Sequence, residues 1–282
     1  MKRPFTIETA SASIQSSIRN AVISFDEMTV SVIKVTFENN GHQVNGYGFC
    51  SNGRYAQEGI IKYRFMPRLF KVSPDSLLDD NGVIDPLKCW SVFMQNEKPG
   101  GHGDRAVAAG ALDMALWDVY AKAYQKPLWK ILSEQFNDNQ FDEQIFVYPG
   151  GGYYYPGKGY EGLKDEFKKY QEQGYKVMKM KVGGDSIEED LRRIDAAFSV
   201  VGCGKNLCVD ANARFDLKEA LAFAEAIHSY DLMWYEEPLD PDDFLSHAIL
   251  AESYVPSLAT GENLFSKHGL QNLLRHGGLR PD

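Results

Sequence analysis

Short runs of alternating apolar and polar residues fill the N-terminal part of the chain. The runs lie at Ile14–Ile18, Val30–Phe37 and Val44–Phe49, and the turn-forming residues Asn39–Gly41 separate the last two. Alternation with a period of two is the pattern of strands that bury one face. The pattern therefore predicts a β-meander between Phe5 and Phe49.

Helical periodicity follows this segment. Apolar side chains recur at helical spacing in Gln57–Phe70 and in Asp104–Tyr124, and Pro127 gives a stop signal after the second helix. A meander followed by helices is an α+β pattern. We predict an α+β domain over residues 1–138, which ends in the polar connection Phe136–Phe141.

Beyond residue 138, short apolar runs alternate with helix-like stretches. We predict strands at Gln144–Tyr148, Val177–Lys181, Leu207–Asp210, Met233–Glu236 and Ser257–Gly261. Helical spacing fills Leu217–Ser229 and Leu264–His276. Strands that recur roughly every 30 residues with helices between them are typical of an α/β barrel of the TIM type.

The predicted barrel domain, residues 139–282, holds about five of the eight strands that a closed barrel needs. We therefore expect the C-terminal part of the barrel to be missing from this chain. The alternative is a complete short variant, which would leave one edge of a buried parallel sheet unpaired.

Composition and charge narrow the possible partners. The chain has 282 residues, of which 44% are hydrophobic and 24% charged, and its net charge is −9. This acidic balance, without a dense basic patch, argues against a nucleic-acid partner. No run reaches the ~20 apolar residues of a membrane span, and residues 1–20 lack the apolar core of a signal peptide. The four cysteines show neither zinc-site nor disulfide-framework spacing, so we expect reduced cysteines in a cytoplasmic protein.

The candidate chemistry begins with a pair of lysines in an apolar run. Lys179 and Lys181 lie two apart in the sequence V-M-K-M-K-V. Residues two apart in a strand share a face, so both ammonium groups would enter the same space. Neighbouring buried ammonium groups disfavour each other's charge, which favours a lysine with a lowered pKa that acts as a base near neutral pH. The alternative interpretation is an edge strand with a solvated lysine face.

A carboxylate ends each of the next three runs. Asp210 lies in C-V-D-A-N, Glu236 in W-Y-E-E-P and Glu262 in A-T-G-E-N, and the spacing between them is close to the roughly 30 residues of a strand–helix–strand unit. Catalytic residues of parallel barrels gather at the carboxyl ends of the strands. Three oxygen ligands from three strands suit a hard cation such as Mg²⁺, and the lack of a histidine at a strand end disfavours zinc.

The order and spacing of these motifs resemble the enolase superfamily, and within it the mandelate racemase subgroup. The motifs K-M-K, D-A-N, E-E-P and T-G-E-N match the subgroup's pattern, and the resemblance spans the whole chain. The segments P-G-G-G-Y-Y-Y-P-G-K and T-G-E-N-L-F-S resemble acid-sugar dehydratases of this subgroup. The resemblance implies a capping domain before a modified β/α barrel, and a lyase that uses Mg²⁺.

The resemblance also assigns roles to the candidate residues. Asp210, Glu236 and Glu262 would hold Mg²⁺, which would stabilise an enediolate. Lys181 would remove the α-proton of a small hydroxy acid. Lys179 would lower the pKa of Lys181 and donate a hydrogen bond to the substrate carboxylate.

Four further residues are candidates for substrate binding. Asn212 and Glu237 directly follow two of the ligands and would support them, and their alternative role is that of ordinary strand-end caps. Asn52 and Lys98 lie in glycine-rich loops of the predicted capping domain, which by resemblance close over the barrel mouth. A surface-loop role is the alternative for both.

The resemblance leaves one catalytic group outside the chain. In the subgroup, a histidine on the seventh barrel strand, paired with an aspartate on the sixth, protonates the departing hydroxyl. We expect this pair beyond residue 282 and assign none of the six histidines to the role. Tyr148 and Tyr153–Tyr155 would shape the pocket or pack against a neighbouring subunit of a homo-oligomer.

Two classes of function remain open from the sequence. One is an enzyme that dehydrates or racemises an acid sugar. The other is a non-catalytic protein, either a metal-binding scaffold or a fragment that lacks the general acid. The intact lysine pair and carboxylate set favour the enzyme.

Overall fold

The computed structural model describes residues 3–39, 41–51 and 55–279. The chain forms two compact units, of which unit 1 comprises Met1–Gln15 and Glu27–Ile145 and unit 2 comprises Ser16–Asp26 and Phe146–Asp282. The segment Ser16–Asp26 therefore packs with the second unit, although its place in the chain put it in the predicted α+β domain. The reason is a backbone contact, since the N–H groups of Arg19 and Tyr154 each donate to the other residue's carbonyl at 2.9 Å.

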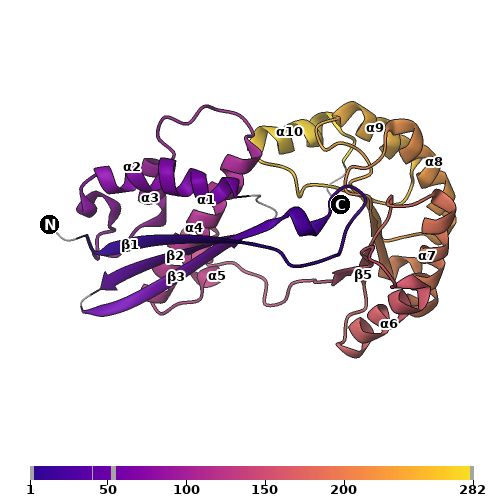
Figure 1. Ribbon diagram of the computed structural model, residues 1–282. Coiled ribbons are helices and arrows are strands. Elements are labelled where there is room, and N and C mark those ends of the chain that lie inside the picture. Colours follow the sequence, from indigo (N-terminus) through magenta and orange to yellow (C-terminus); the bar gives the residue numbers. More distant parts are fainter. Residues whose placement is uncertain (1–2, 40, 52–54, 280–282) are drawn as a thin grey trace. The chain divides into compact units, whose positions relative to one another are not determined.

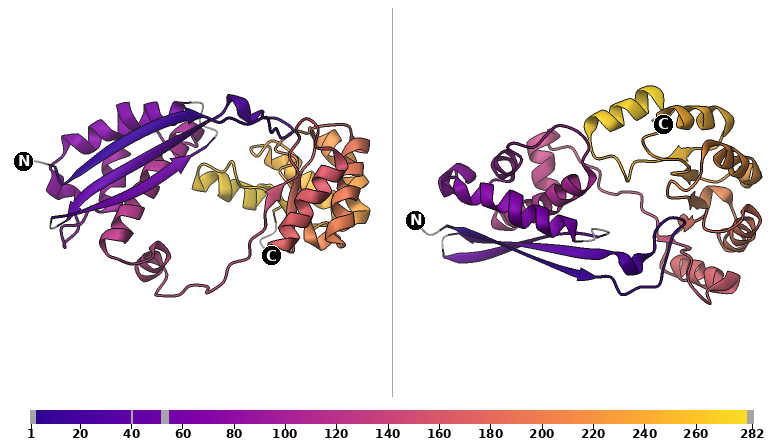
Figure 2. Two further views of the ribbon diagram at one scale, coloured as in Figure 1. Left: turned by 60° about the horizontal axis from the view of Figure 1, so that its bottom comes forward. Right: turned by 45° about the horizontal axis from the view of Figure 1, so that its top comes forward.

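Unit 1 is an antiparallel three-stranded sheet with helices on one face (Figures 1 and 2). The strands are β1 (Phe5–Ser13), β2 (Thr29–Asn39) and β3 (His42–Cys50), in that order across the sheet. The helices are α1 (Ala56–Ile60), a π-helical turn η2 (Ile61–Phe65), α2 (Met66–Lys71), α3 (Pro86–Phe93), α4 (Gly103–Ala123) and α5 (Leu128–Phe136). Short 3₁₀ turns lie at η1 (Phe25–Glu27) and η3 (Pro74–Leu77).

Helix α4 packs closely on strand β3 because two glycines make room for it. A Cβ atom on Gly46 would lie 2.2 Å from the carbonyl oxygen of Ala115, and one on Gly48 would lie 2.0 Å from that of Ala111. Neither contact is sterically allowed, so the strand requires glycine at both positions. The interface is part of one apolar core that runs through unit 1.

The sequence predicted most of unit 1, with two differences. The strands around Val30–Phe37 and Val44–Phe49 and the helix Asp104–Tyr124 are confirmed within one or two residues. The predicted strand at Ile14–Ile18 is wrong, because β2 begins at Thr29 and the register pairs that residue with Ser13. The predicted helix Gln57–Phe70 is present, but a π-helical turn interrupts it.

Unit 2 is built on a parallel sheet whose five strands follow each other in chain order. The strands are β4 (Gly150–Gly151), β5 (Met178–Lys181), β6 (Leu207–Asp210), β7 (Trp234–Glu236) and β8 (Leu258–Ala259). The helices are α6 (Gly159–Glu172), α7 (Ile187–Val201), α8 (Leu217–Ile227), α9 (Phe244–Ser253) and α10 (Lys267–His276), with 3₁₀ turns η4 (Gly204–Asn206) and η5 (His228–Tyr230). Successive parallel strands joined by helices are the arrangement of a β/α barrel. The helices lie outside the strands in Figure 1.

Three of the five predicted strands of unit 2 agree with the structure at their carboxyl ends, whereas the predicted strand Ser257–Gly261 is shorter in the structure, where β8 spans Leu258–Ala259. The strand Leu207–Asp210 is confirmed at both ends, and β5 and β7 end at the predicted residues. The predicted strand Gln144–Tyr148 is wrong, since pairing starts only where the carbonyl of Pro149 accepts from the Lys179 N–H. In this register, residues before Pro149 would have to pair with residues before Met178, where β5 begins. They therefore have no strand to pair with.

Two helix starts in unit 2 show how side chains set the boundaries. Asp216 and Glu219 form a capping box at the start of α8, in which each side chain accepts from the other residue's N–H. Ser266 caps α10, which therefore begins three residues later than the predicted Leu264.

Within the described part of the chain, no helix is both long and apolar enough to cross a membrane.

Candidate active site

The parallel register places three of the candidate residues in one layer. Lys181 pairs with Asp210 across β5 and β6, and Asp210 pairs with Glu236 across β6 and β7. Glu236 in turn lies level with Ala259 at the end of β8, three residues before Glu262. Residues paired across parallel strands point to the same side of the sheet. The one-per-strand spacing in the sequence therefore becomes a cluster at one end of the sheet.

Three carboxylates of this cluster converge on a common point. One oxygen each from Asp210, Glu236 and Glu262 lies within 4.8 Å of the others, and the first two residues are buried while Glu262 is exposed. Burial raises the pKa of Glu236, and the charge of Asp210 adds to the rise while Lys179 opposes it. Acidic oxygens held this close repel each other without a cation between them, so the donor set fits a hard divalent ion.

Both lysines of the pair reach these carboxylates. Lys181 Nζ lies 2.5 Å from Asp210 Oδ2, and Lys179 Nζ lies 2.7 Å from Glu236 Oε1 and 3.2 Å from Asp210 Oδ2. Burial by itself would lower the pKa of Lys179, but the charges of Asp210 and Glu236 outweigh burial and raise it above its ordinary value. The solvated edge strand considered from the sequence is absent here, because β5 lies between β4 and β6 and Lys181 is 6% exposed.

Aromatic side chains surround the lysines. Lys179 Nζ lies 5.8 Å from the ring centre of Tyr148, and Lys181 Nζ lies 5.3 Å from that of Tyr153. The Tyr148 ring packs edge-on against Trp234, with ring centres 5.0 Å apart. Tyr148 and Tyr153, two of the four tyrosines that the sequence singled out, thus lie next to the lysines within unit 2.

Trp234 is a site residue to which the sequence assigned no role. Its indole Nε1 donates to Glu236 Oε2 at 3.0 Å, while Lys179 occupies the other oxygen of that carboxylate. Strand periodicity could have identified it from the sequence, because Trp234 lies two residues before Glu236 and so shares its face of β7. This bond fixes the orientation of the Glu236 carboxylate.

The two residues that follow ligands support the site in different ways. The backbone N–H of Asn212 donates to Asp210 Oδ1 at 2.9 Å, and its side-chain Nδ2 donates to Glu262 Oε1 at 3.3 Å. Its Oδ1 is buried and has no hydrogen-bond partner among the described residues, so it is a further oxygen at the site. Both Asn212 and Glu237 have positive φ angles, 48° and 39°, which bend the chain sharply after each ligand.

Glu237 is buried next to the three carboxylates. Its residue is 1% exposed, and both carboxylate oxygens accept from Asn263 Nδ2, at 3.2 and 3.1 Å. Burial raises the pKa of Glu237 to about 7, with a further rise from the charge of Glu262. Glu237 thus holds Asn263 next to Glu262, and contact of Glu237 with a substrate stays a prediction.

The two candidates from the predicted capping domain belong to unit 1. Asn52 lies outside the described residues. Lys98 is exposed and borders a cavity of about 400 Å³ in unit 1 that Arg64, His102 and Arg105 also line. Arg105 donates to the carbonyl of Lys98 at 2.5 Å, which fixes the backbone at that lysine. Substrate contact by either residue stays a prediction.

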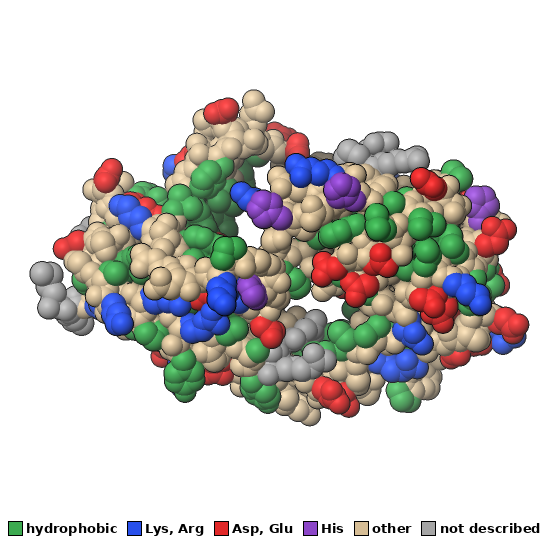
Figure 3. Space-filling view, turned by 90° about the horizontal axis from the view of Figure 1, so that it is seen from above, with side chains coloured by type: hydrophobic (Ala, Val, Ile, Leu, Met, Phe, Trp, Pro, Cys, Tyr) green, Lys and Arg blue, Asp and Glu red, His purple; other side chains and the backbone are tan. Residues whose placement is uncertain are grey.

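The surface charges and the free cysteines agree with what the sequence composition predicted. Figure 3 shows acidic side chains spread over the face that it presents, with basic side chains between them. All four cysteines are free, and Cys203 alone among them is exposed.

Two family models match the chain. The N-terminal domain of the mandelate racemase / muconate lactonizing enzyme family matches residues 6–133, and the enolase C-terminal domain-like family matches residues 162–280. Together they extend over both units of the structure.

Named relatives and solved structures agree with these matches. The 3,6-anhydro-α-L-galactonate cycloisomerase of Streptomyces coelicolor is 33% identical over 64% of this chain and 47% of its own length. The L-talarate/galactarate dehydratase of Salmonella typhimurium is 31% identical over 78% of this chain and 52% of its own. A racemase from Streptomyces coelicolor, solved with bound magnesium, superposes with a TM-score of 0.79 at 26% identity over 98% of this chain and 73% of its own. The chain thus spans about half the length of the curated relatives.

Proposed function

Because the chain belongs to the enolase superfamily, in its mandelate racemase and muconate lactonizing enzyme subgroup, we propose that it carries the metal site and the base of a Mg²⁺-dependent acid-sugar dehydratase. The observation that carries the proposal is the cluster of two lysines and three carboxylates at the ends of four strands. Its relatives support the substrate class, since the Salmonella protein is named for dehydrating two acid sugars.

Asp210, Glu236 and Glu262 are the residues that would hold Mg²⁺. Their oxygens come from three adjacent strand ends, and the unpartnered Oδ1 of Asn212 lies next to them in the chain and the fold. Oxygen donors in a partly open cluster suit Mg²⁺, which keeps positions for water and substrate. When bound, the ion supplies positive charge next to a substrate carboxylate, where negative charge accumulates as the α-proton leaves.

Lys181 is the residue that we assign as the base. It is the more buried of the two lysines, and its ammonium lies between Asp210 and the ring of Tyr153. Lys179, with its ammonium at Glu236, is placed to donate a hydrogen bond to the substrate carboxylate.

Within this class we propose D-tartrate as the substrate, with oxaloacetate and water as the products. The α-proton leaves one carbon, the C–O bond to the hydroxyl on the neighbouring carbon breaks, and that hydroxyl leaves as water after taking up a proton. The support for tartrate is the resemblance of T-G-E-N-L-F-S and of the tyrosine- and glycine-rich segment after Pro149 to D-tartrate dehydratase.

The test is a product assay of the full-length protein, with the general acid that the resemblance places beyond residue 282, against a panel of acid sugars that includes D-tartrate, L-tartrate, meso-tartrate, galactarate and arabinonate. We expect oxaloacetate from D-tartrate with Mg²⁺ and none with excess EDTA. Turnover of another acid without tartrate would contradict the named substrate but not the class. No dehydration of any acid, with binding of Mg²⁺ intact, would contradict the class.

A second candidate is racemisation or cycloisomerisation, because one relative is named a cycloisomerase and one solved neighbour a racemase. These reactions begin with the same removal of an α-proton but do not release water. Mass spectrometry of the reaction mixture separates them, since an isomerase forms a product of equal mass and a dehydratase forms a keto acid that is lighter by one water.

A further inference from the structure

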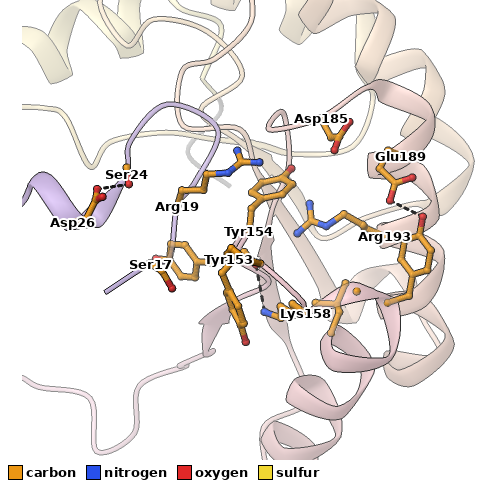
Figure 4. A pocket seen from close by; sticks show the side chains of 15 residues that line it. Ser17, Arg19, Ser24, Asp26, Tyr153, Tyr154, Lys158, Asp185, Glu189 and Arg193 are labelled. Carbon is orange, nitrogen blue, oxygen red and sulfur yellow. Dashed lines mark hydrogen bonds between the residues drawn. The ribbon is translucent and has the colours of Figure 1, made fainter. Parts of the chain in front are cut away.

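A buried polar cluster lies behind the proposed base. It consists of Tyr154, Asp190 and Arg193, which we call the Tyr154 cluster. Asp190 is 1% exposed, and its Oδ1 accepts from the Tyr154 hydroxyl at 2.6 Å and from Arg193 at 2.9 Å. The Arg193 guanidinium also stacks on the Tyr154 ring, 3.8 Å from its centre. Figure 4 shows Arg193 beside Tyr154 at the wall of a cavity of about 490 Å³.

Arg193 ties this cluster directly to Lys181. Its NH1 donates to the carbonyl oxygen of Lys181 at 2.8 Å, and its NH2 donates to the carbonyl oxygen of Gly152 at 2.5 Å. One guanidinium therefore joins the end of β5, where the base stands, to the loop after β4. A planar guanidinium fixes both carbonyls at once, which a lysine ammonium does not do in the same geometry.

Asp190 and Tyr154 hold the backbone two and three residues after Lys181. Asp190 Oδ2 accepts from the N–H of Gly183 at 2.6 Å, and the Tyr154 hydroxyl oxygen accepts from the N–H of Gly184 at 3.0 Å. The packing is as tight as the bonding, since a Cβ on Gly184 would lie 2.6 Å from the Tyr154 ring. The backbone on the C-terminal side of Lys181 thus has little freedom.

The same tyrosine also anchors a segment from far earlier in the chain. Arg19 pairs with Tyr154 through both backbone N–H groups, and its guanidinium lies 4.9 Å from the centre of the Tyr154 ring. The neighbouring Tyr153 presents its ring to the Lys181 ammonium. The Tyr154 position therefore connects the segment Ser16–Asp26, the loop after β4 and the loop after β5.

We propose that the Tyr154 cluster is a positioning unit for Lys181, so that Tyr154, Asp190 and Arg193 act on the reaction through the backbone of the base. This inference rests on the proposed function. The side chain of Lys181 is long and flexible, and the carboxylate of Asp210 is its strongest partner in this structure. A cation on Asp210 weakens that contact, and the fixed backbone and the Tyr153 ring then remain to aim the amine. A misplacement of about 1 Å in such a group can cost about 10²-fold in rate.

The test compares three variants of the protein loaded with Mg²⁺. Tyr154→Phe removes the hydroxyl but keeps the ring, and Arg193→Lys keeps the charge but removes the fork. Tyr160→Phe is the matched control, because this tyrosine lines the same cavity and its hydroxyl bonds to Glu189 and Arg192 rather than to the Tyr154 cluster. The measured quantities are the rate of α-proton exchange of D-tartrate and of galactarate in ²H₂O, the KM for that exchange, and the affinity for Mg²⁺ by calorimetry.

We expect the exchange rate at saturating acid to fall about tenfold or more in Tyr154→Phe and Arg193→Lys, with KM and Mg²⁺ affinity within about twofold of wild type. Tyr160→Phe should match wild type in all three. Loss of a merely structural contact would lower the melting temperature and leave the rate of the folded protein unchanged. Exchange at the wild-type rate in both cluster variants, or an equal loss in Tyr160→Phe, would overturn the inference.

A readout without substrate separates this inference from the proposed function. Amide hydrogen exchange at Gly183 and Gly184 should quicken at least tenfold in Tyr154→Phe, because one of the two amides loses its acceptor and the other depends on Asp190. If the wild-type protein exchanges no α-proton, the proposed function fails while quickened amides still support the hold on the Lys181 backbone. Unchanged amides in Tyr154→Phe would overturn that hold.

Discussion

The ammonium of Lys181 lies 2.5 Å from Oδ2 of Asp210, so the proposed base and a proposed metal ligand share one contact. Lys179 reaches the same oxygen at 3.2 Å. A cation on Asp210 and the two ammonium groups therefore compete for the same negative charge. Binding of the metal and the protonation of Lys179 are linked for this reason.

The first prediction is that Mg²⁺ binding releases protons. The carboxylates of Asp210 and Glu236 raise the pKa of Lys179 despite its burial, and burial raises the pKa of Glu236. A bound cation opposes the first effect and requires Glu236 to be ionised, so metal binding favours the deprotonated form of both groups. The affinity should therefore rise as the pH rises. Calorimetry at one pH in two buffers of different ionisation enthalpy measures the protons released, and an affinity that stays flat or falls with pH would contradict the linkage.

The second prediction concerns the ligands themselves. Glu236→Gln removes a charge from the donor set while keeping the shape of the side chain, so we expect the Kd for Mg²⁺ to rise at least about tenfold. Glu252→Gln, an exposed change on α9, is the control and should leave the Kd unchanged. A Kd for Glu236→Gln within twofold of wild type would remove this residue from the metal site.

The third prediction concerns stability in the absence of metal. Burial, with the charge of Glu262, raises the pKa of Glu237 from 4.5 to about 7 in the folded protein. Because the pKa of Glu237 is higher in the folded than in the unfolded protein, its protonated form stabilises the fold. This contribution is complete below pH 4.5 and is lost as the pH rises through 7. The free energy of unfolding of the metal-free protein should therefore fall by on the order of 1–3 kcal/mol over this range.

Denaturant titrations at pH 4.5 and pH 7.5 measure this loss. Glu237→Gln should show a smaller difference between the two pH values, because the replaced group does not titrate. Mg²⁺ should also reduce the difference, since a cation at Glu262 offsets one cause of the raised pKa. A difference that persists unchanged in Glu237→Gln would assign the titration to another group.

The sequence was sufficient to predict the layer of site residues but not their pairing. A period of two places Lys179 and Lys181 on one face of β5, and one carboxylate at the end of each following strand brings Asp210 and Glu236 beside them. The ion pairs between lysines and carboxylates depend on distances across strands, which periodicity does not carry. The pattern therefore suggested two ammonium groups facing each other, whereas the structure pairs both with Asp210.

The remaining differences come from contacts between distant parts of the chain. Ser16–Asp26 reads as a continuation of the meander, yet Tyr154 pairs with Arg19 and draws the segment into unit 2. A short apolar run suggested a strand at Gln144–Tyr148, but a strand needs a neighbouring strand to pair with, and pairing with β5 begins only at Pro149. Local patterns contain no information on either partner.

The most direct test of the central claim is α-proton exchange in Lys181→Ala. The experiment follows the loss of the α-proton signal of D-tartrate and of galactarate by proton NMR in ²H₂O with Mg²⁺, and it depends only on the base and the metal site. We expect wild type to exchange one of these acids, and Lys181→Ala to exchange it at least about 10²-fold more slowly, with Mg²⁺ affinity kept. Exchange by Lys181→Ala at a rate close to wild type would contradict the assignment of Lys181 as the base.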